Sequence, residues 1–301
     1  MIKYYTWALS EKVLSILPLG TKLYYFAGSL LTKNKKGKNA SFLSSLILVK
    51  KVKDLVPPNS TILDVGTGWF HHESFLLWLS GNYKIILFDI RNNSKLIYIK
   101  NYIHHIIENL DYLSEQLHLD KTESERKLSE ILKMNNKEDI YTYCNFEPHI
   151  TQNLDTLSIY NNSINFMISN CVLNHIPLKM LDSELGILKK LLNPGGMMYF
   201  LIGHDDHWSF HDNTANIFNY YRYSDKFYKI LFENKFEFQN RLVKPELDEL
   251  FKKNGLEVIE YFPYITTESK NAVKTLGKIN SRFSKYPSSE LSAIWSFYLL
   301  K

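Results

Sequence analysis

TILDVGTGWFHHESFLLWLSGNYKIILFDIR, residues 61–91, is the stretch that decides the fold. Its first five residues form a short apolar, β-branched run, and Gly66-Thr67-Gly68 follows at once, ahead of a segment with helical spacing. Glycine suits a backbone that turns sharply beneath a ligand, because it adopts positive φ freely and has no side chain to block close approach. The pattern predicts a strand, a glycine turn and a helix whose first amides face a ligand.

A second strand is predicted over residues 83–88, and Asp89 stands at its end. An acidic residue at the tip of the second strand of a βαβ unit lies beside the first turn and can accept both hydroxyls of an adenosine ribose. The expected ligand is therefore an adenosine compound.

The spacing of the glycines separates two classes of adenosine ligand. The dinucleotide pattern Gly-x-Gly-x-x-Gly would place its third glycine at His71, which argues against NAD. The pattern Asp64-x-Gly66-x-Gly68 instead resembles the first motif of class I S-adenosylmethionine-dependent methyltransferases. In that family the acidic residue and the loop backbone hold the methionine end of the cofactor. The resemblance implies S-adenosylmethionine as cofactor and S-adenosylhomocysteine as product.

Later segments extend the resemblance over residues 61–203. Residues 140–146 alternate as a third strand does, and residues 164–169 read as a fourth strand. An amphipathic helix, an Asn-Pro-Gly-Gly turn and a fifth strand follow over residues 183–202, and strands six and seven are expected at 256–262 and 291–300. The resemblance implies an α/β fold, a Rossmann-like seven-stranded sheet.

The expected organisation is an N-terminal helical cap, residues 1–58, and a cofactor-binding domain, residues 59–301. The cap contains predicted helices at residues 4–16, 23–31 and 42–55, and it ends at Pro57-Pro58. A helical insertion is predicted over about residues 94–137, because this connection is longer than a usual crossover.

Composition places the chain among ordinary globular proteins, with 301 residues, 45% hydrophobic and 22% charged. Two cysteines are too few for a disulfide framework, which favours a cytoplasmic location. The apolar residues 13–31 are interrupted by Pro18, Gly20 and Lys22, so neither a signal peptide nor a membrane span is predicted. Lysines cluster within residues 33–53, either as a phosphate-binding patch or as a solvated face.

The expected cofactor contacts come from the glycine loop and from the ends of the strands. Asn145 would lie near the end of the third strand, where the resemblance places a polar side chain against the adenine amine. Trp69 could flank the methionine group or anchor the core. The full expected set is Asp64, Gly66, Thr67, Gly68, Trp69, Asp89, Ile90, Asn145, Phe146, Asn170 and Cys171.

The candidate catalytic residues lie in His204-Asp205-Asp206-His207, directly after the fifth strand. A histidine is a natural base for a hydroxyl acceptor, because its pKa lies near the working pH. His207 is the first choice, with Asp206 orienting it or holding the acceptor. His204, His211 and His175 are further candidates for the base. The alternative is that these residues have no catalytic role and are polar residues of a loop.

Substrate contacts are expected at His175, Trp208, Tyr221, Arg222 and Arg241, the arginines for an anionic acceptor group, although aromatic residues at this spacing also suit core packing. A divalent metal held by Asp205, Asp206 and Asn170 is a further alternative. It is not favoured, because the fourth-strand ligand would be an amide.

The predicted function is methyl transfer to a hydroxyl of a small molecule or glycan. Asn170-Cys171-Val172-Leu173 stands where methyltransferases of base amino groups often carry an Asn/Asp-Pro-Pro-aromatic motif, which argues against that acceptor. RNA- or protein-directed methylation through the basic N-terminal patch remains an alternative, as does a non-catalytic partner subunit.

Overall fold

The computed structural model describes residues 2–24, 26 and 42–301. The chain divides into two compact units, each assembled from several segments. Unit 1 contains Met1–Leu30, Cys171–Ser183 and Ile202–Tyr298, and unit 2 contains Leu31–Asn170, Glu184–Leu201 and Leu299–Lys301. In the part of the chain that the structure describes, no helix is both long and apolar enough to cross a lipid bilayer.

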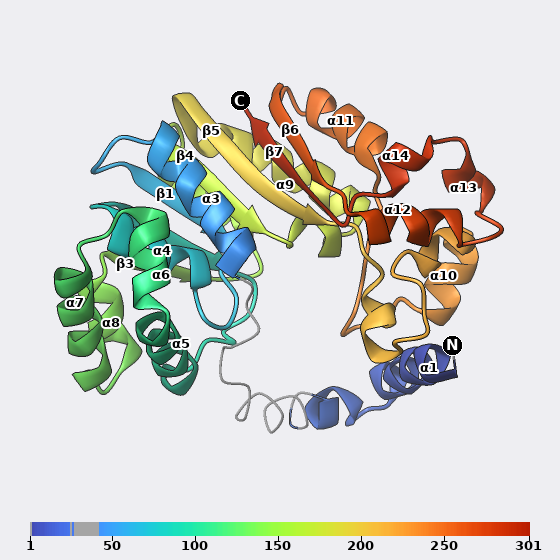
Figure 1. The fold of residues 1–301 in the computed structure, drawn as a ribbon, viewed down its shortest axis with the longest axis horizontal. Helices are drawn as coiled ribbons and strands as arrows, with labels where there is room; N and C mark the ends of the chain where they lie inside the picture. The colour runs from blue at the N-terminus through green and yellow to red at the C-terminus, as the bar shows by residue number, and fades with distance from the viewer. Residues whose placement is uncertain (1, 25, 27–41) are drawn as a thin grey trace. The chain divides into compact units, whose positions relative to one another are not determined.

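A seven-stranded sheet confirms the predicted α/β architecture, with the strand order β3-β2-β1-β4-β5-β7-β6 (Figure 1). Strands β3, β2, β1, β4 and β5 pair in parallel. The amide of Ile294, just before β7, donates to the carbonyl of Tyr264 at the end of β6, so these two strands run antiparallel. The strands are β1 Thr61–Val65, β2 Lys84–Asp89, β3 Phe146–Ile150, β4 Ile164–Asn170, β5 Leu192–Gly203, β6 Val258–Tyr264 and β7 Trp295–Leu300.

Strand β1 lies inside the sheet between β2 and β4, and all of its residues after Thr61 are buried. Ile62 and Leu63 are fully buried, as expected for a parallel strand covered on both faces. The register pairs Val65 with Phe88, which brings the carboxyl ends of β1 and β2 together. The loops that follow these two strands therefore start side by side.

Helix α4, His72–Ser80, follows the glycine turn as predicted. His71, at the position of the third dinucleotide glycine, has φ 53° and ψ 48°, the left-handed conformation that glycine would otherwise supply. Its ring is buried between two hydroxyls, with Nδ1 2.8 Å from Thr67 Oγ1 and Nε2 3.0 Å from Tyr141 Oη. Burial lowers the pKa of His71 to about 3, so the ring is neutral and structural.

The long connection after β2 is helical, as expected, and its helices gather beside β3 (Figure 1). The predicted third strand at residues 140–146 is wrong, because most of that segment is helical and β3 begins only at Phe146. Asn136 caps the helix by accepting from the amide of Asp139. The helices are α5 Leu96–Glu108, α6 Leu110–Leu117, α7 Lys121–Lys133 and α8 Lys137–Tyr143.

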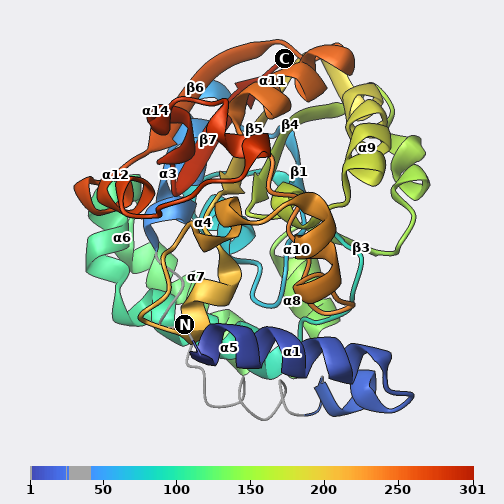
Figure 2. The same ribbon diagram turned by 90° about the vertical axis from the view of Figure 1, so that its right-hand side faces the viewer.

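The N-terminal helices belong to different units. Helix α1, Ile2–Ile16, contacts η3 and α10 within unit 1 (Figure 2), whereas α3, Phe42–Leu55, packs on α4 and β4 within unit 2. Most of the helix expected at residues 23–31 lies outside the described residues. The remaining elements are η1 Leu154–Tyr160, η2 Leu173–His175, α9 Leu178–Leu191, η3 His207–His211, η4 Asn219–Arg222, α10 Asp225–Leu231, α11 Lys244–Lys253, α12 Thr267–Lys274, α13 Ser281–Ser284 and α14 Ser288–Leu291.

An aromatic core holds unit 1 together. Its members come from α1, η3, η4, α10 and α13, and aromatic rings of this size bury a large apolar area each. They include Tyr4, Trp208, Phe218, Tyr220, Tyr221, Tyr228, Phe232 and Phe283. Aromatic residues make up 14% of the sequence, and many of them therefore serve packing in this core.

The left-handed backbone at His71 predicts an unusual order of stability. His71→Ala and His71→Gly both lose the two buried hydrogen bonds, but alanine also keeps the steric cost of positive φ. We expect the alanine variant to be less stable than the glycine variant by about 1 kcal/mol. Urea unfolding measures this difference as a free energy of unfolding.

His118 provides the control. It also has positive φ, 51°, but it is exposed at the end of α6, and its side chain makes no hydrogen bond to the residues that the structure describes. At position 118 the alanine variant should again be less stable than the glycine variant by about 1 kcal/mol in the free energy of unfolding. Neither variant should show the further destabilisation that both His71 variants suffer from the loss of two buried hydrogen bonds. An alanine variant at position 71 as stable as the glycine variant would contradict the strained conformation.

Candidate active site

The glycine loop is fixed to the tip of β2 by two backbone hydrogen bonds. The amides of Gly66 and Thr67 both donate to the carbonyl oxygen of Phe88, at 2.8 and 3.1 Å. Gly66 and Gly68 have φ values of 77° and 68°, which a side chain would oppose. The loop therefore has the tight glycine geometry that the sequence predicts.

Asp89 is oriented by backbone amides on both sides of its carboxylate. Gly68 N donates to Oδ2 and Arg91 N donates to Oδ1, each at 2.9 Å. The side chain is only partly buried, and each oxygen keeps a lone pair for a further donor. Ile90 beside it is exposed, and Thr151 N donates to the Asp89 carbonyl. The carboxylate is thus oriented by the backbone and can accept further hydrogen bonds.

Asp64 is enclosed instead of facing a ligand. Its side chain is 2% exposed, and Ser74 Oγ donates to Oδ2 at 2.6 Å. Burial, together with the charge of Glu73, raises the pKa of Asp64 to about 7. In this structure Asp64 therefore anchors the first turn of α4 through Ser74, and its contact with the cofactor stays a prediction. Trp69 is half-buried, its ring 5.6 Å from that of Tyr98.

Asn170 also points into unit 2. Its Nδ2 donates to Glu73 Oε1 at 2.6 Å, and Ser45 Oγ donates to the same oxygen at 2.6 Å. The side chain thus ties the end of β4 to α4 and α3. Cys171, the next residue, belongs to unit 1 and has φ 55°.

The expected adenine contacts Asn145 and Phe146 lie at the wrong end of β3. Because the strand starts at Phe146, both residues stand at its amino end, and Asn145 Nδ2 donates to the carbonyl of Tyr83 at the start of β2. Asp89 and the glycine loop lie at the carboxyl ends of β2 and β1. Thr151, which directly follows β3, is the residue that reaches this edge.

Two of the three catalytic candidates are structural. His204 is 5% exposed, its ring contacts the Leu242 carbonyl and the Ser296 hydroxyl, and burial lowers its pKa to about 4. Asp206 is fully buried, and it accepts from Tyr4 Oη at 2.6 Å and from Trp208 N at 3.0 Å. Burial raises the pKa of Asp206 to about 7. It anchors α1 and caps η3, so it does not orient His207.

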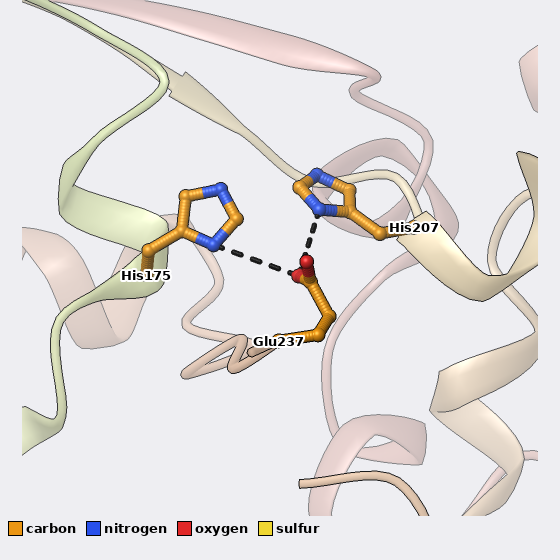
Figure 3. Close-up of side chains that lie close together, drawn as sticks. All are labelled: His175, His207 and Glu237. Atoms are coloured by element: carbon orange, nitrogen blue, oxygen red, sulfur yellow. Dashed lines mark hydrogen bonds and ion pairs between the residues drawn. The ribbon is translucent and has the colours of Figure 1, made fainter. Parts of the chain in front are cut away.

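His207 is instead paired with Glu237, and His175 lies beside them (Figure 3). Glu237 Oε1 is 3.0 Å from His207 Nδ1 and 3.6 Å from His175 Nδ1, and the two ring centroids are 4.8 Å apart. All three side chains are between one-fifth and two-fifths exposed. The structure thus brings two predicted residues together with a carboxylate that the sequence analysis missed.

The hydrogen bonds define which ring nitrogen of each histidine carries the proton. His175 Nδ1 lies 2.8 Å from the Phe238 carbonyl oxygen, and His207 Nδ1 lies against the Glu237 carboxylate; both partners can only accept. In each neutral ring Nε2 therefore has the lone pair. Figure 3 shows both Nε2 atoms pointing away from Glu237.

Glu237 separates the pKa values of the two rings. Burial alone would lower the pKa of His207, but the hydrogen bond and charge of Glu237, helped by Asp205 and Asp206, outweigh it and raise the value. At His175 burial dominates and lowers the pKa despite Glu237. His207 is thus the stronger base of the two.

Two amide side chains that the sequence analysis missed hold this group in place. Gln239 accepts from His207 N at 3.2 Å and donates to the Asp205 carbonyl at 2.8 Å. Asn240 Nδ2 donates to the carbonyls of Leu173 and Ile176, on both sides of His175. The sequence signal for these residues is a short, mostly polar run, Glu-Phe-Gln-Asn-Arg, which the structure places between α10 and α11.

Three of the expected substrate contacts belong to the protein interior. Trp208 and Tyr221 are 1% exposed members of the aromatic core. Arg241 is 5% exposed, donates to the carbonyls of Tyr220 and Tyr223, and pairs with Asp225. Arg222 is exposed at the surface.

The residues expected to bind a divalent metal are not the ones that the structure brings together. Asp206 is closed by Tyr4 and Trp208, and Asn170 is bonded to Glu73, so the expected set of oxygen ligands is wrong. Among the described residues, His175, His207 and Glu237 offer three potential ligand atoms within 4.8 Å of one another.

Comparison with known proteins identifies the family. A profile described as a methyltransferase domain matches residues 34–261, most of the chain. Among solved structures, the chain is similar to phosphoethanolamine N-methyltransferase 2 of Haemonchus contortus in complex with S-adenosyl-L-methionine, at 15% identity over 85% of this chain and 52% of that chain, with a TM-score of 0.46. The chain spans about half the length of that enzyme.

A second similar structure is geranyl diphosphate C-methyltransferase from Streptomyces coelicolor A3(2), in complex with Mg²⁺, geranyl diphosphate and S-adenosyl-L-homocysteine. The identity is 10%, the match covers 84% of this chain and 75% of that chain, and the TM-score is 0.45. No curated protein matches the sequence. From the family profile, together with the strand order and the glycine loop, we conclude that the chain belongs to the class I S-adenosylmethionine-dependent methyltransferases.

Proposed function

We propose that this chain transfers the methyl group of S-adenosylmethionine to a hydroxyl of a small molecule or glycan. The observation that carries the choice of oxygen is the pairing of His207 with Glu237 at 3.0 Å. A hydroxyl is a weak nucleophile until its proton is removed, whereas an amine needs no such base once it is neutral. A histidine held by a carboxylate is suited to that proton.

The residues of the glycine loop fit the cofactor. When bound, S-adenosylmethionine supplies a methyl group on a positively charged sulfur, which an oxygen nucleophile can displace. Asp89 would accept the ribose hydroxyls, since its carboxylate is oriented by Gly68 and Arg91 and remains partly open. The loop between Gly66 and Gly68 would approach the cofactor with backbone atoms alone.

His207 would take the acceptor proton at Nε2. Glu237 accepts from Nδ1, which fixes the tautomer and stabilises the imidazolium that forms when Nε2 gains a proton. Gln239 holds the backbone of the same segment, so the ring stays in place during the transfer. These residues orient and move one proton.

The contacts of the α3 lysines favour a small acceptor over a nucleic acid, because these lysines are engaged within the protein. Lys50 donates to Gln116 Oε1 at 2.7 Å, Lys53 donates to the Leu117 carbonyl, and Lys51 lies over the Tyr199 ring. These three side chains serve contacts within unit 2. The lysines at positions 33 to 38 lie outside the described residues.

Asp89→Ala is expected to weaken the binding of S-adenosylhomocysteine by about 10–100-fold, because charged hydrogen bonds to the ribose are lost. Isothermal titration calorimetry measures the change. Asp155→Ala, an exposed aspartate of the same unit, should bind as the wild type does. Equal affinity of the Asp89 variant and this control would refute the ribose contact.

His207→Ala is expected to lower turnover by about 10²–10⁴-fold and to keep cofactor affinity, since it removes a general base. Release of S-adenosylhomocysteine, assayed with a panel of phenols, polyols and methyl glycosides, measures turnover. Glu237→Gln is the matched variant, because its amide oxygen can still accept from His207 Nδ1 while the charge is gone.

The pH profile of activity separates the role of His207 as the base from the role of Glu237 in raising the pKa of that base. The base works in its neutral form, so wild-type activity should fall as pH drops through a His207 pKa above about 6.5. Without the Glu237 charge that pKa decreases, and the acidic limb should move to lower pH. An unshifted limb, or activity lost on chelation and restored by a divalent ion, would contradict the base role. Failure of every acceptor would favour a non-catalytic partner subunit.

A further inference from the structure

Two histidine rings approach one carboxylate oxygen in the group that His175, His207 and Glu237 form, here called the His–Glu cluster (Figure 3). His207 Nδ1 lies 3.0 Å and His175 Nδ1 lies 3.6 Å from Glu237 Oε1. The shorter contact is the hydrogen bond of the candidate base, whereas 3.6 Å is beyond hydrogen-bond distance. His175 is thus part of the cluster without being part of the hydrogen bond that holds the base.

Side-chain hydrogen bonds hold the backbone at all three positions of the His–Glu cluster, which lies within unit 1. Asn240 holds the turn of the first histidine, Gln239 accepts from the amide of the second, and Asn234 Oδ1 accepts from the amide of the glutamate at 3.0 Å. The three side chains remain 37%, 21% and 25% exposed, in chain order. The cluster is therefore held in place and open to an ion from solvent.

The donor atoms of the cluster suit a transition-metal ion. Two imidazole nitrogens and a carboxylate oxygen form the protein ligands of many Zn²⁺ sites, with bonds of about 2.0–2.2 Å that place neighbouring donors about 3.3 Å apart. The two nitrogen–oxygen distances, 3.0 and 3.6 Å, lie on either side of that value. One ligand atom from each residue lies within 4.8 Å of the other two, so a small rotation of the rings completes the site.

The same donor set disfavours the commoner divalent ions. Mg²⁺ and Ca²⁺ prefer oxygen ligands, whereas imidazole nitrogens favour Zn²⁺ and its neighbours among the transition metals. Three protein ligands leave one position of a tetrahedral ion for water. Zn²⁺ is therefore the ion that the cluster fits best.

A metal on Nδ1 and a proton acceptor at Nε2 exclude each other in one imidazole ring. A neutral ring has one N–H and one lone pair. When Nδ1 gives its lone pair to a metal, the proton moves to Nε2, which then donates instead of accepting. The ion would thus remove the lone pair that His207 uses as a base. His175 would exchange its hydrogen bond to the Phe238 carbonyl for the ion.

We propose that the His–Glu cluster binds one Zn²⁺ ion and that this ion inhibits methyl transfer by coordinating His207 Nδ1. The inhibition rests on the proposed function, because it requires that His207 is the base. The metal site itself does not depend on that role. Removal of the ion returns the lone pair to Nε2 and restores the base.

Isothermal titration calorimetry of the full chain with zinc chloride tests the metal site. A residue that only supports a metal ligand is worth about 10–100-fold in metal affinity, so loss of a ligand in His175→Ala or Glu237→Gln should weaken Zn²⁺ binding at least as much. His104→Ala, which removes an exposed histidine from unit 2, should bind as the wild type does. Equal Zn²⁺ affinity of wild type and His175→Ala, or no binding to wild type, would overturn the site.

Anomalous diffraction from zinc-soaked crystals of the wild type gives a second readout that needs no variant. One peak should lie about 2.0–2.2 Å from Nδ1 of both histidines and from an oxygen of Glu237. A peak bonded to His207 Nε2, or a peak away from the cluster, would overturn the proposed coordination. Magnesium chloride should give no peak at this position.

Release of S-adenosylhomocysteine measures the inhibition, with each variant compared with its own activity without zinc. Saturating Zn²⁺ should lower the activity of wild type and of His104→Ala by about 10²-fold or more, as expected for a lost base, and EDTA should restore it. His175→Ala should keep its activity at the same zinc concentration. Wild-type activity that zinc leaves unchanged or raises would overturn the inhibition.

The failure of this inference and the failure of the proposed function give different results. Zinc bound in the His–Glu cluster, without release of S-adenosylhomocysteine from any acceptor, would sustain the metal site and refute both the methyltransferase activity and its inhibition. Turnover that depends on His207, together with equal zinc binding by wild type and His175→Ala, would sustain the proposed function and refute the metal site.

Discussion

The carbonyl oxygen of Phe88 accepts two successive amides of the glycine loop, and the cofactor site depends on this contact. It is possible only because β1 and β2 pair in parallel with their carboxyl ends level. Once Gly66 and Thr67 are fixed, Gly68 directs its amide at Asp89 and the chain enters α4 through the left-handed residue His71. A ligand can then meet a bare backbone and an oriented carboxylate at one edge of the sheet.

Unit 1 is organised by a short polar segment with no regular structure of its own. Glu237 pairs with His207, Gln239 holds the backbone on either side of Asp206, and Asn240 holds the turn that contains His175. Each bond uses a side chain to satisfy backbone groups or a ring nitrogen that would otherwise be unpaired. The same segment therefore stabilises the loops and fixes the tautomers of the candidate base.

The regular parts of the fold could be predicted because local pattern and tertiary role agree, as in β1 and α4. The third strand could not, because residues 140–143 alternate like a strand yet form the second half of a capped helix, α8, while the true strand contains Pro148. Proline is tolerated there because β3 is at the edge of the sheet. The places of Asp89 at the end of β2 and of His207 after β5 could be predicted from the sequence. The place of Glu237 could not, because its partner is 30 residues away in sequence and no periodicity connects them.

We propose that the glycine loop and Asp89 hold the adenosine end of S-adenosylmethionine. A crystal structure of the full chain with S-adenosylhomocysteine would show whether they do. We expect both ribose hydroxyls to lie within hydrogen-bond distance of the Asp89 carboxylate, with Gly66 and Gly68 against the ligand. A ligand bound elsewhere, or a ribose that makes no contact with Asp89, would contradict it.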